Sequence, residues 1–183
     1  MIKIGLTGNI ASGKSTVEGI LKNLNYKVVD LDMVSHKLLN TVCKNEVIKN
    51  FNTVERAELA SIVFNDKNKL KTLENILYPK IKDFILNYFE ENNSEKILFI
   101  SGAQIYQAGF SDMFDKIIFV DANKDLRLQR LIKRNSYSSE IAQNRINAQN
   151  DDFKNKADYI IENNSDKKEL YDNILIVLNK IIG

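Results

Sequence analysis

Gly8-Asn9-Ile10-Ala11-Ser12-Gly13-Lys14-Ser15-Thr16 is the stretch of sequence that decides the fold. It matches the pattern G-x-x-x-x-G-K-S/T, in which a loop between a strand and a helix surrounds phosphate groups. Gly8 and Gly13 allow backbone conformations and close approaches that a side chain would block, so successive N–H groups can point at phosphate oxygens. A helix that begins at the second glycine adds the positive end of its dipole. The stretch therefore predicts a phosphate-binding loop.

The individual residues of the loop predict how it binds ATP together with Mg2+. Lys14 is expected to reach the β- and γ-phosphates, and the hydroxyl of Ser15 is expected to be a ligand of the Mg2+ ion. Thr16 is expected to donate a hydrogen bond to the α-phosphate, while Ala11 and Ser12 belong to the cradle itself. An accidental match is the alternative, but the loop lies between a predicted strand and a predicted helix, which is the context that the pattern requires.

Short apolar runs and amphipathic stretches alternate along the chain. The apolar runs predict five strands, at Ile2–Thr7, Tyr26–Asp30, Lys96–Ser101, Lys116–Asp121 and Ala157–Glu162. Apolar residues at helical spacing predict helices, most clearly at Val17–Leu24, Leu70–Phe89, Leu126–Lys133 and Lys168–Ile182. Runs that are apolar throughout suit a sheet covered on both faces. We therefore expect an α/β fold of three layers around a mostly parallel five-stranded sheet.

The length of 183 residues suits a single domain with subregions. The loop and the predicted strands assign residues 1–30, 96–125 and 157–183 to a nucleotide-binding core. Two long intervals remain between the strands, and no Gly/Ser-rich linker separates them from the core. We expect the interval 31–95 to be a helical insertion that binds the acceptor of the phosphate group. The interval 126–156 is expected to be a lid that keeps water away from ATP.

Composition and charge argue against several kinds of partner. A formal net charge of +2 gives no basis for general binding to nucleic acid, and no apolar run approaches the roughly 18 residues of a membrane span. The amino terminus lacks the basic and apolar regions of a secretory leader, and the single cysteine, Cys43, cannot form an internal disulfide. We therefore expect a cytoplasmic protein that binds neither nucleic acid nor membranes. A monomer is the working expectation, although the sequence does not determine the oligomeric state.

A phosphate-binding loop alone does not distinguish kinases from GTPase switches or motor ATPases. Switch GTPases carry D-x-x-G after a strand and N-K-x-D for guanine, but no glycine of this chain has an aspartate three residues before it. Asn123-Lys124-Asp125 is one residue short of the guanine motif. The long coupling segments of motor proteins are absent as well. These absences favour a phosphotransferase that acts on a small, nucleotide-like acceptor.

Two aspartates follow the second predicted strand. Asp30 and Asp32 stand at its carboxyl end, where parallel α/β sheets bind their ligands. We expect Asp32 to be the base that accepts the proton of the acceptor hydroxyl. The alternative is that Asp32 caps a helix beginning near Met33, and the two roles are compatible. His36 lies one helical turn later, where it would pair with Asp32, meet an anionic substrate, or be a simple surface residue.

Arginines recur at helical spacing after the fourth predicted strand. Arg127, Arg130 and Arg134 fall on one side of the expected helix, and Arg145 lies one turn before Gln149 in the expected lid. Guanidinium groups can stabilise the negative charge of a phosphoryl group in transfer. We expect Arg134 to take part in catalysis and Arg130 and Arg145 to contact the nucleotide. The alternative is a solvated basic helix face, and spacing alone does not say which arginine touches phosphate.

Motifs along nearly the whole chain resemble the dephospho-CoA kinase family. The start of that family is similar to the opening Ile4-Gly5-Leu6-Thr7-Gly8 and to the phosphate loop. Its next motif, V-I-D-A-D, is similar to Val29-Asp30-Leu31-Asp32. The similarity extends through its R-x-x-L-x-x-I-V-F segment and beyond, at Arg56, Leu59, Ile62-Val63-Phe64, Leu70, Leu73, Ile76, Pro79, Arg130-Leu131, Arg134, Arg145-Ile146, Ala148-Gln149, Ala157-Asp158-Tyr159-Ile160-Ile161 and Asn163. Together these motifs are more specific than the phosphate loop alone.

The resemblance implies an enzyme with the three-layer fold of P-loop kinases. The implied reaction transfers the γ-phosphate of ATP to the ribose 3′-hydroxyl of dephospho-CoA, which is the last step of coenzyme A synthesis. The resemblance also implies that Asp32 is the base, that Lys14 and the lid arginines stabilise charge, and that the insertion holds dephospho-CoA. The identity of the acceptor follows from the resemblance alone, since the residues themselves indicate only the class of reaction.

Two positions depart from the family pattern. Tyr78-Pro79 stands where the family usually has H-P, which removes a cationic contact. Ala103-Gln104-Ile105-Tyr106-Gln107 replaces P-L-L-F-E, so Gln107 is neutral where a glutamate is usual, unless a neighbour such as Asp112 supplies the carboxylate. Two alternatives therefore remain. One is a kinase for another small molecule, such as a nucleoside, a nucleotide or a shikimate-like alcohol, and the other is a nucleotide-binding regulator that has lost transfer.

Overall fold

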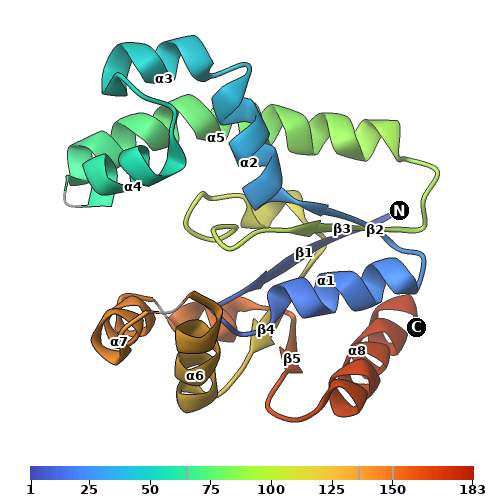
Figure 1. Cartoon of the computed structure of the whole chain (residues 1–183). Helices are drawn as coiled ribbons and strands as arrows, with labels where there is room; N and C mark the ends of the chain where they lie inside the picture. Colours follow the sequence, from blue (N-terminus) through green and yellow to red (C-terminus); the bar gives the residue numbers. More distant parts are fainter. Residues whose placement is uncertain (65, 136, 150) are drawn as a thin grey trace. The chain divides into compact units, whose positions relative to one another are not determined.

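The five predicted strands occur in the predicted order, with one or more helices in most of the intervals between them. The computed structural model describes all residues except 65, 136 and 150, and for residue 151 it describes the backbone alone. The strands are β1 (Ile2–Gly8), β2 (Lys27–Asp30), β3 (Ile97–Ser101), β4 (Lys116–Asp121) and β5 (Tyr159–Glu162). The α-helices are α1 (Lys14–Asn23), α2 (Leu31–Asn40), α3 (Lys44–Phe51), α4 (Arg56–Phe64), α5 (Lys67–Glu91), α6 (Lys124–Asn135), α7 (Ser139–Asn147) and α8 (Lys167–Ile182). Two short 3-10 helices, η1 (Ser111–Met113) and η2 (Asp151–Lys156), are also present, and Figure 1 labels the strands and the α-helices.

The chain divides into two compact units. The first unit comprises Met1–Val29 and Glu95–Gly183, and the second comprises Asp30–Ser94. The first unit therefore contains nearly the whole sheet, the phosphate loop and the helices α1, α6, α7 and α8. The second unit contains the helices α2 to α5.

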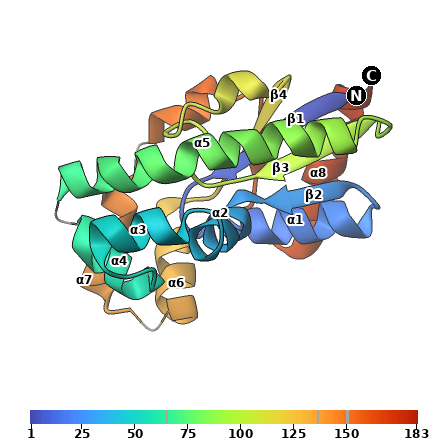
Figure 2. The ribbon, with the colours of Figure 1, turned by 90° about the horizontal axis from the view of Figure 1, so that it is seen from above.

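The first unit is built on a five-stranded sheet with the strand order β2-β3-β1-β4-β5. β1 pairs in parallel with both β3 and β4, and β4 pairs in parallel with β5. Seen from above in Figure 2, β2, β3 and β1 run side by side. The register aligns Gly8 with Val120 and Asp121 with Glu162, so the segments that follow β1, β4 and β5 all leave the sheet at one edge. The predicted α/β fold with a mostly parallel sheet is confirmed.

One face of this sheet is covered by α1 and α8, which lie side by side in Figure 1. Val17 and Leu21 are one turn apart on α1 and are both buried, and α8 buries Leu170, Ile174 and Leu178 at the same spacing. These helix residues pack on alternate strand residues of one sheet face, among them Ile4, Leu6, Phe99, Ile118, Val120 and Ile161. This core holds the start of α1 at the end of β1, where the phosphate loop connects them.

The segment from α6 to α7 packs directly on the phosphate loop. Its two helices contact each other through a small apolar cluster around Leu131, Ala142 and Ile146, each at most 1% exposed. Ile10 and Ala11 of the loop pack against the same cluster. The predicted lid segment is therefore anchored on the loop by apolar contacts as well as by the polar contacts described below.

The second unit is a group of four helices. α5 runs for 25 residues and packs against α2, α3 and α4. It continues through Pro79, where the proline has no N–H to donate to the carbonyl four residues earlier. Asp66 caps its first turn by accepting from the N–H groups of Asn68 and Lys69. Within the part of the chain that the structure describes, no helix combines the length and the apolar character needed to cross a membrane.

Candidate active site

The phosphate loop is a tight turn that depends on its glycines. The N–H of Ser12 donates to the carbonyl of Asn9 at 3.1 Å, and the backbone φ angles of Ala11 and Gly13 are 60° and 100°. A Cβ on Gly8 would lie 2.5 Å from the carbonyl oxygen of Val120, the residue beside it on β4. The first glycine is therefore required by the close approach of the neighbouring strand, and the second by its left-handed backbone.

The start of α1 offers backbone donors to an anion. Gly13 precedes the helix and provides no side-chain cap, and the first N–H groups of any α-helix lack a carbonyl partner in the preceding turn. These N–H groups and the positive end of the helix dipole favour negative charge at this position. The loop residues predicted from sequence to bind phosphate are thus together at one helix terminus.

Lys14 is held by two groups that the sequence analysis did not single out. Its Nζ lies 2.9 Å from Oε1 of Glu18, one helical turn later, and donates to Oγ of Ser101 at 2.8 Å. Ser101 is the last residue of β3 and is completely buried. The spacing of Lys14 and Glu18 was a readable signal for their contact. The approach of Ser101 depends on the pairing of β1 with β3.

Arg130 lies at the phosphate loop, and its contact with the nucleotide stays a prediction. Its guanidinium donates to the carbonyl of Asn163 at 3.0 Å and to the carbonyl of Ser12 at 3.4 Å, and burial lowers the pKa of this group. Asn163 follows β5 and also donates to the carbonyl of Ser12, at 2.7 Å. Arg130 and Asn163 therefore brace the backbone immediately before the second glycine.

We expect Gly13→Ala to lower the free energy of unfolding by about 2 kcal/mol because it combines backbone strain with a clash. A Cβ on Gly13 would lie 2.0 Å from Nδ2 of Asn163. The matched control is Gly19→Ala on α1, where a Cβ would meet no atom within 4 Å and should stabilise the helix by about 0.5 kcal/mol. Urea unfolding of the three proteins checks the prediction, and a Gly13→Ala variant as stable as the wild type would contradict it.

Arg127 does not have the place expected of a lid arginine. It is 1% exposed, its Nε donates to the carbonyl of Ile10 at 3.0 Å, and its Nη2 donates to Oε1 of Gln149 at 2.9 Å. The same oxygen of Gln149 accepts from the N–H of Ile10 at 2.7 Å. Helical spacing predicted a shared side for Arg127, Arg130 and Arg134 but not that α6 packs on the loop by that side. Arg127 therefore supports the loop backbone, and Gln149 contacts both Arg127 and the loop.

Arg134 and Arg145 are both exposed on the predicted lid. Arg134 lies near the end of α6, and its Nε donates to the side chain of Asn135 at 2.9 Å. The guanidinium of Arg145 on α7 lies 4.9 Å from the ring centre of Tyr137, a cation–π distance. The structure thus brings Arg130 to the phosphate loop and places Arg134 and Arg145 in contacts within the segment 126–156.

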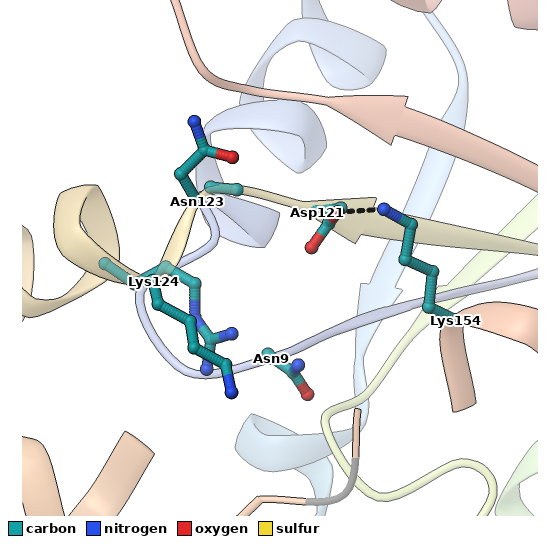
Figure 3. Close-up of a pocket in the computed structure, with 7 residues that line it drawn as sticks. Asn9, Asp121, Asn123, Lys124 and Lys154 are labelled. Carbon is teal, nitrogen blue, oxygen red and sulfur yellow. Dashed lines mark hydrogen bonds and ion pairs between the residues drawn. The ribbon is translucent and has the colours of Figure 1, made fainter. Parts of the chain in front are cut away.

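A polar cavity of about 270 Å³ lies beside the loop. Figure 3 shows residues from three places around it, the loop after β1, the end of β4 with the start of α6, and η2. The cavity is lined by Asn9, Asp121, Ala122, Asn123, Lys124, Arg127 and Lys154. Lys154 forms an ion pair with Asp121 across it. A second, more open groove of about 640 Å³ adjoins Ser15 and Thr16 and is also lined by Gly19, Ile20, Asn23, Lys167, Lys168 and Tyr171.

Asp32 belongs to the second unit and lies in the first turn of α2. The alternative in which Asp32 caps a helix beginning near Met33 is wrong, because α2 begins at Leu31 and Asp30 is its N-cap. Oδ1 of Asp30 accepts from the N–H of Asp32 at 2.8 Å. The carboxylate of Asp32 is thus not the cap of this helix, and the residue is exposed. The ring of His36 lies 3.5 Å from Nδ2 of Asn40, on the same helix.

The two positions that depart from the family pattern lie in different surroundings. Tyr78 on α5 donates to the carboxylate of Glu74 at 3.0 Å, and burial together with this carboxylate raises the pKa of the phenol. Tyr78 therefore engages an acidic partner of its own helix. Gln107 is exposed in the turn after β3, and the carboxylate of Asp112 accepts from the hydroxyl of Ser111 at 3.3 Å.

Comparison with known proteins identifies the family that this chain resembles. Residues 2–169 match the family model described as dephospho-CoA kinase. A dephospho-CoA kinase from Listeria innocua is 32% identical over an alignment of 196 positions, which covers 98% of this chain and 97% of the relative. The crystal structure of TT1252 from Thermus thermophilus aligns with a TM-score of 0.90 at 26% identity and covers 100% of this chain and 98% of that chain. Dephospho-CoA kinase from Campylobacter jejuni aligns with a TM-score of 0.71 at 29% identity, covering 98% and 96%.

These matches span nearly the whole chain and include the loop, the strands and the segment from α6 to β5. The residues quoted for the resemblance fall within the matched region, from Ile4 to Asn163. The chain belongs to the dephospho-CoA kinase family.

Proposed function

We propose that this enzyme transfers the γ-phosphate of ATP to the ribose 3′-hydroxyl of dephospho-CoA, forming coenzyme A. The observation that carries the proposal is the intact phosphate loop at the uncapped start of α1, in a chain that belongs to this family. Phosphoryl transfer requires positioning and stabilisation of charge more than covalent chemistry by the protein. In this proposal, the groups at the loop would supply the stabilisation of charge and would position the phosphates of ATP.

ATP would lie with its phosphates on the loop and the first turn of α1. Thr16 would donate to the α-phosphate, and the open groove beside it would receive the nucleoside. Mg2+ bound with ATP is coordinated largely by phosphate oxygens and water, and it neutralises charge on the transferred group. The exposed hydroxyl of Ser15 fits the role of its protein ligand. Among the described residues, no group of three or more His, Cys, Asp or Glu side chains is placed to hold a metal ion.

The acceptor would be activated by Asp32. An exposed carboxylate in the first turn of α2 is suited to accept the proton of a hydroxyl group during attack on phosphorus. In this proposal the helices of residues 31–95 bind dephospho-CoA, and the segment 126–156 acts as the lid. Closure of the lid would bring Arg134 and Arg145 to the phosphates.

The arginines are expected to divide between binding and catalysis. Arg130 already contacts the carbonyl of Ser12, so Arg130→Ala should raise the KM for ATP about 10-fold by loosening the loop and removing a nearby positive charge.

Arg134→Ala should instead lower kcat about 10-fold at an unchanged KM for ATP, since its contact would form only in the closed state. Steady-state kinetics with varied ATP separate the two. Lys133→Ala, at an exposed neighbouring position of α6, is the matched control, and wild-type kinetics for Arg134→Ala would remove its catalytic role.

A panel of acceptors tests the proposed function itself. Release of ADP by the purified enzyme is measured with dephospho-CoA, a nucleoside, a nucleoside monophosphate, shikimate, or no acceptor. We expect dephospho-CoA to give by far the highest kcat/KM. Equal or better turnover of another acceptor would assign the enzyme to a different substrate. Binding of ATP without any acceptor-dependent release of ADP would indicate a regulator that has lost transfer.

A further inference from the structure

We propose that Glu18 is a positioning residue for phosphoryl transfer, which acts with Ser101 to hold the ammonium group of Lys14 at the phosphate loop. The inference deepens the proposed function and rests on it, because it assigns what orients the lysine that meets the phosphates. All three residues lie in the first unit, on α1 and at the end of β3. Their contacts are therefore described within one compact body.

The three polar groups form a closed triangle. Nζ of Lys14 lies 2.9 Å from Oε1 of Glu18 and 2.8 Å from Oγ of Ser101, and the Ser101 hydroxyl donates to the same Oε1. Glu18 is 6% exposed and Ser101 is 0% exposed. An ammonium group has three N–H donors, and the triangle directs two of them. The long side chain of Lys14 is thereby held in one orientation.

The ordinary explanation for a lysine and a glutamate four residues apart is an ion pair that stabilises the helix. Such pairs normally lie on exposed surfaces, where they contribute little. Glu18 instead faces the interior and is joined by a residue of the central sheet. Burying a carboxylate is costly unless it is paired and hydrogen-bonded. The arrangement therefore makes sense as a support for Lys14 and not as a contribution to the stability of α1.

A buried carboxylate beside a phosphate site has two opposite consequences. Its negative charge repels the phosphates and weakens nucleotide binding. Its hold on Lys14 keeps the ammonium oriented toward the place where charge develops in the transition state, which accelerates transfer. Removing the charge should therefore tighten ATP binding and slow the reaction. If Glu18 only stabilised the helix, its loss would not combine tighter binding of ATP with slower transfer.

Glu18→Gln tests this prediction, because it keeps the size and hydrogen-bonding capacity of the side chain but removes its charge. We expect kcat to fall about 10-fold and the KM for ATP to fall about 3-fold. Calorimetric titration with MgATP in the absence of acceptor should show tighter binding as well. Glu91→Gln, the same change at an exposed residue at the end of α5, is the matched control and should alter neither parameter.

A carboxylate introduced on β3 is expected to restore the activity that Glu18→Gln loses. In the double variant Glu18→Gln with Ser101→Asp, the carboxylate on β3 lies at the position that already contacts Nζ of Lys14, so most of kcat should return. If Glu18→Gln does not fold, Ser101→Ala carries the test, and its kcat should fall in the same direction.

Wild-type kcat in Glu18→Gln, or a lower kcat with unchanged MgATP affinity and no rescue, would overturn the inference. Failure of the wild-type enzyme to phosphorylate dephospho-CoA would instead overturn the proposed function. In that event the calorimetric comparison still decides whether the charge of Glu18 acts on the nucleotide: tighter binding by Glu18→Gln supports its placement beside the phosphates, and equal binding refutes it.

Discussion

Lys14→Ala is expected to lower kcat/KM for phosphoryl transfer by on the order of 10³, the largest kinetic effect of any single substitution proposed for this enzyme. Lys14 begins α1 directly after the loop, and its ammonium group is held by Glu18 and Ser101. Alanine removes both the charge and the oriented donors that would meet the β- and γ-phosphates. Steady-state assays of ADP release with dephospho-CoA measure the loss. A loss smaller than about 10-fold would contradict a central role for this lysine.

The same substitution has a separate effect on stability. Without the lysine, the carboxylate of Glu18 stays buried next to Ser101 and loses its cationic partner, which is expected to cost about 3 kcal/mol in the free energy of unfolding. The double variant Lys14→Ala with Glu18→Gln removes both charges and serves as the control. It should regain most of the lost stability but none of the lost activity, which shows that the kinetic defect does not arise from unfolding.

Asp32→Asn is expected to lower kcat by on the order of 10² or more while the affinity for ATP stays nearly unchanged. The amide keeps the shape of the side chain but cannot accept the proton of the acceptor hydroxyl. The cap of α2 does not depend on this side chain, because Asp30 occupies the N-cap position. We therefore expect the loss to appear in kcat, with the first turn of α2 still capped by Asp30. Steady-state kinetics and calorimetric titration with MgATP measure the two quantities.

Asp30→Asn is the matched control, two residues earlier in the chain. Asparagine is as good an N-cap as aspartate, so α2 should keep its first turn and kcat should stay close to the wild-type value. The opposite outcome, in which Asp30→Asn loses activity and Asp32→Asn keeps it, would transfer the role of the base to Asp30. Near-normal turnover of both variants would remove the assignment of a base to this segment.

The strands, the main helices and the phosphate loop were predictable because their signals are local. The run Ile97-Leu98-Phe99-Ile100 is apolar throughout because it is buried throughout, and the loop pattern contains its own strand and helix context. The start of α2 was misplaced by a similarly local ambiguity. Asp30 and Asp32 are both good caps, and the sequence does not say which of them satisfies the first N–H groups.

The contacts that shape the candidate site join distant parts of the chain. Ser101 reaches Lys14 across 87 positions of sequence, and Arg127 reaches Ile10 across 117. These contacts depend on the pairing of β1 with β3 and on the docking of α6 against the loop, which residue spacing does not reveal. The periodicity of the arginines predicted that they share one side of the helix. On that side, however, Arg127 is buried against the loop, while Arg134 is exposed near the end of α6.

The destination of the γ-phosphate tests the central claim most directly. The enzyme is incubated with dephospho-CoA, Mg2+ and ATP labelled in its γ-phosphate, and the products are separated and treated with a nucleotidase specific for 3′-phosphates. We predict that the label appears in coenzyme A and is released by that nucleotidase. Label found only in inorganic phosphate, or in a product that resists the 3′-specific enzyme, would contradict the proposed transfer to the ribose 3′-hydroxyl.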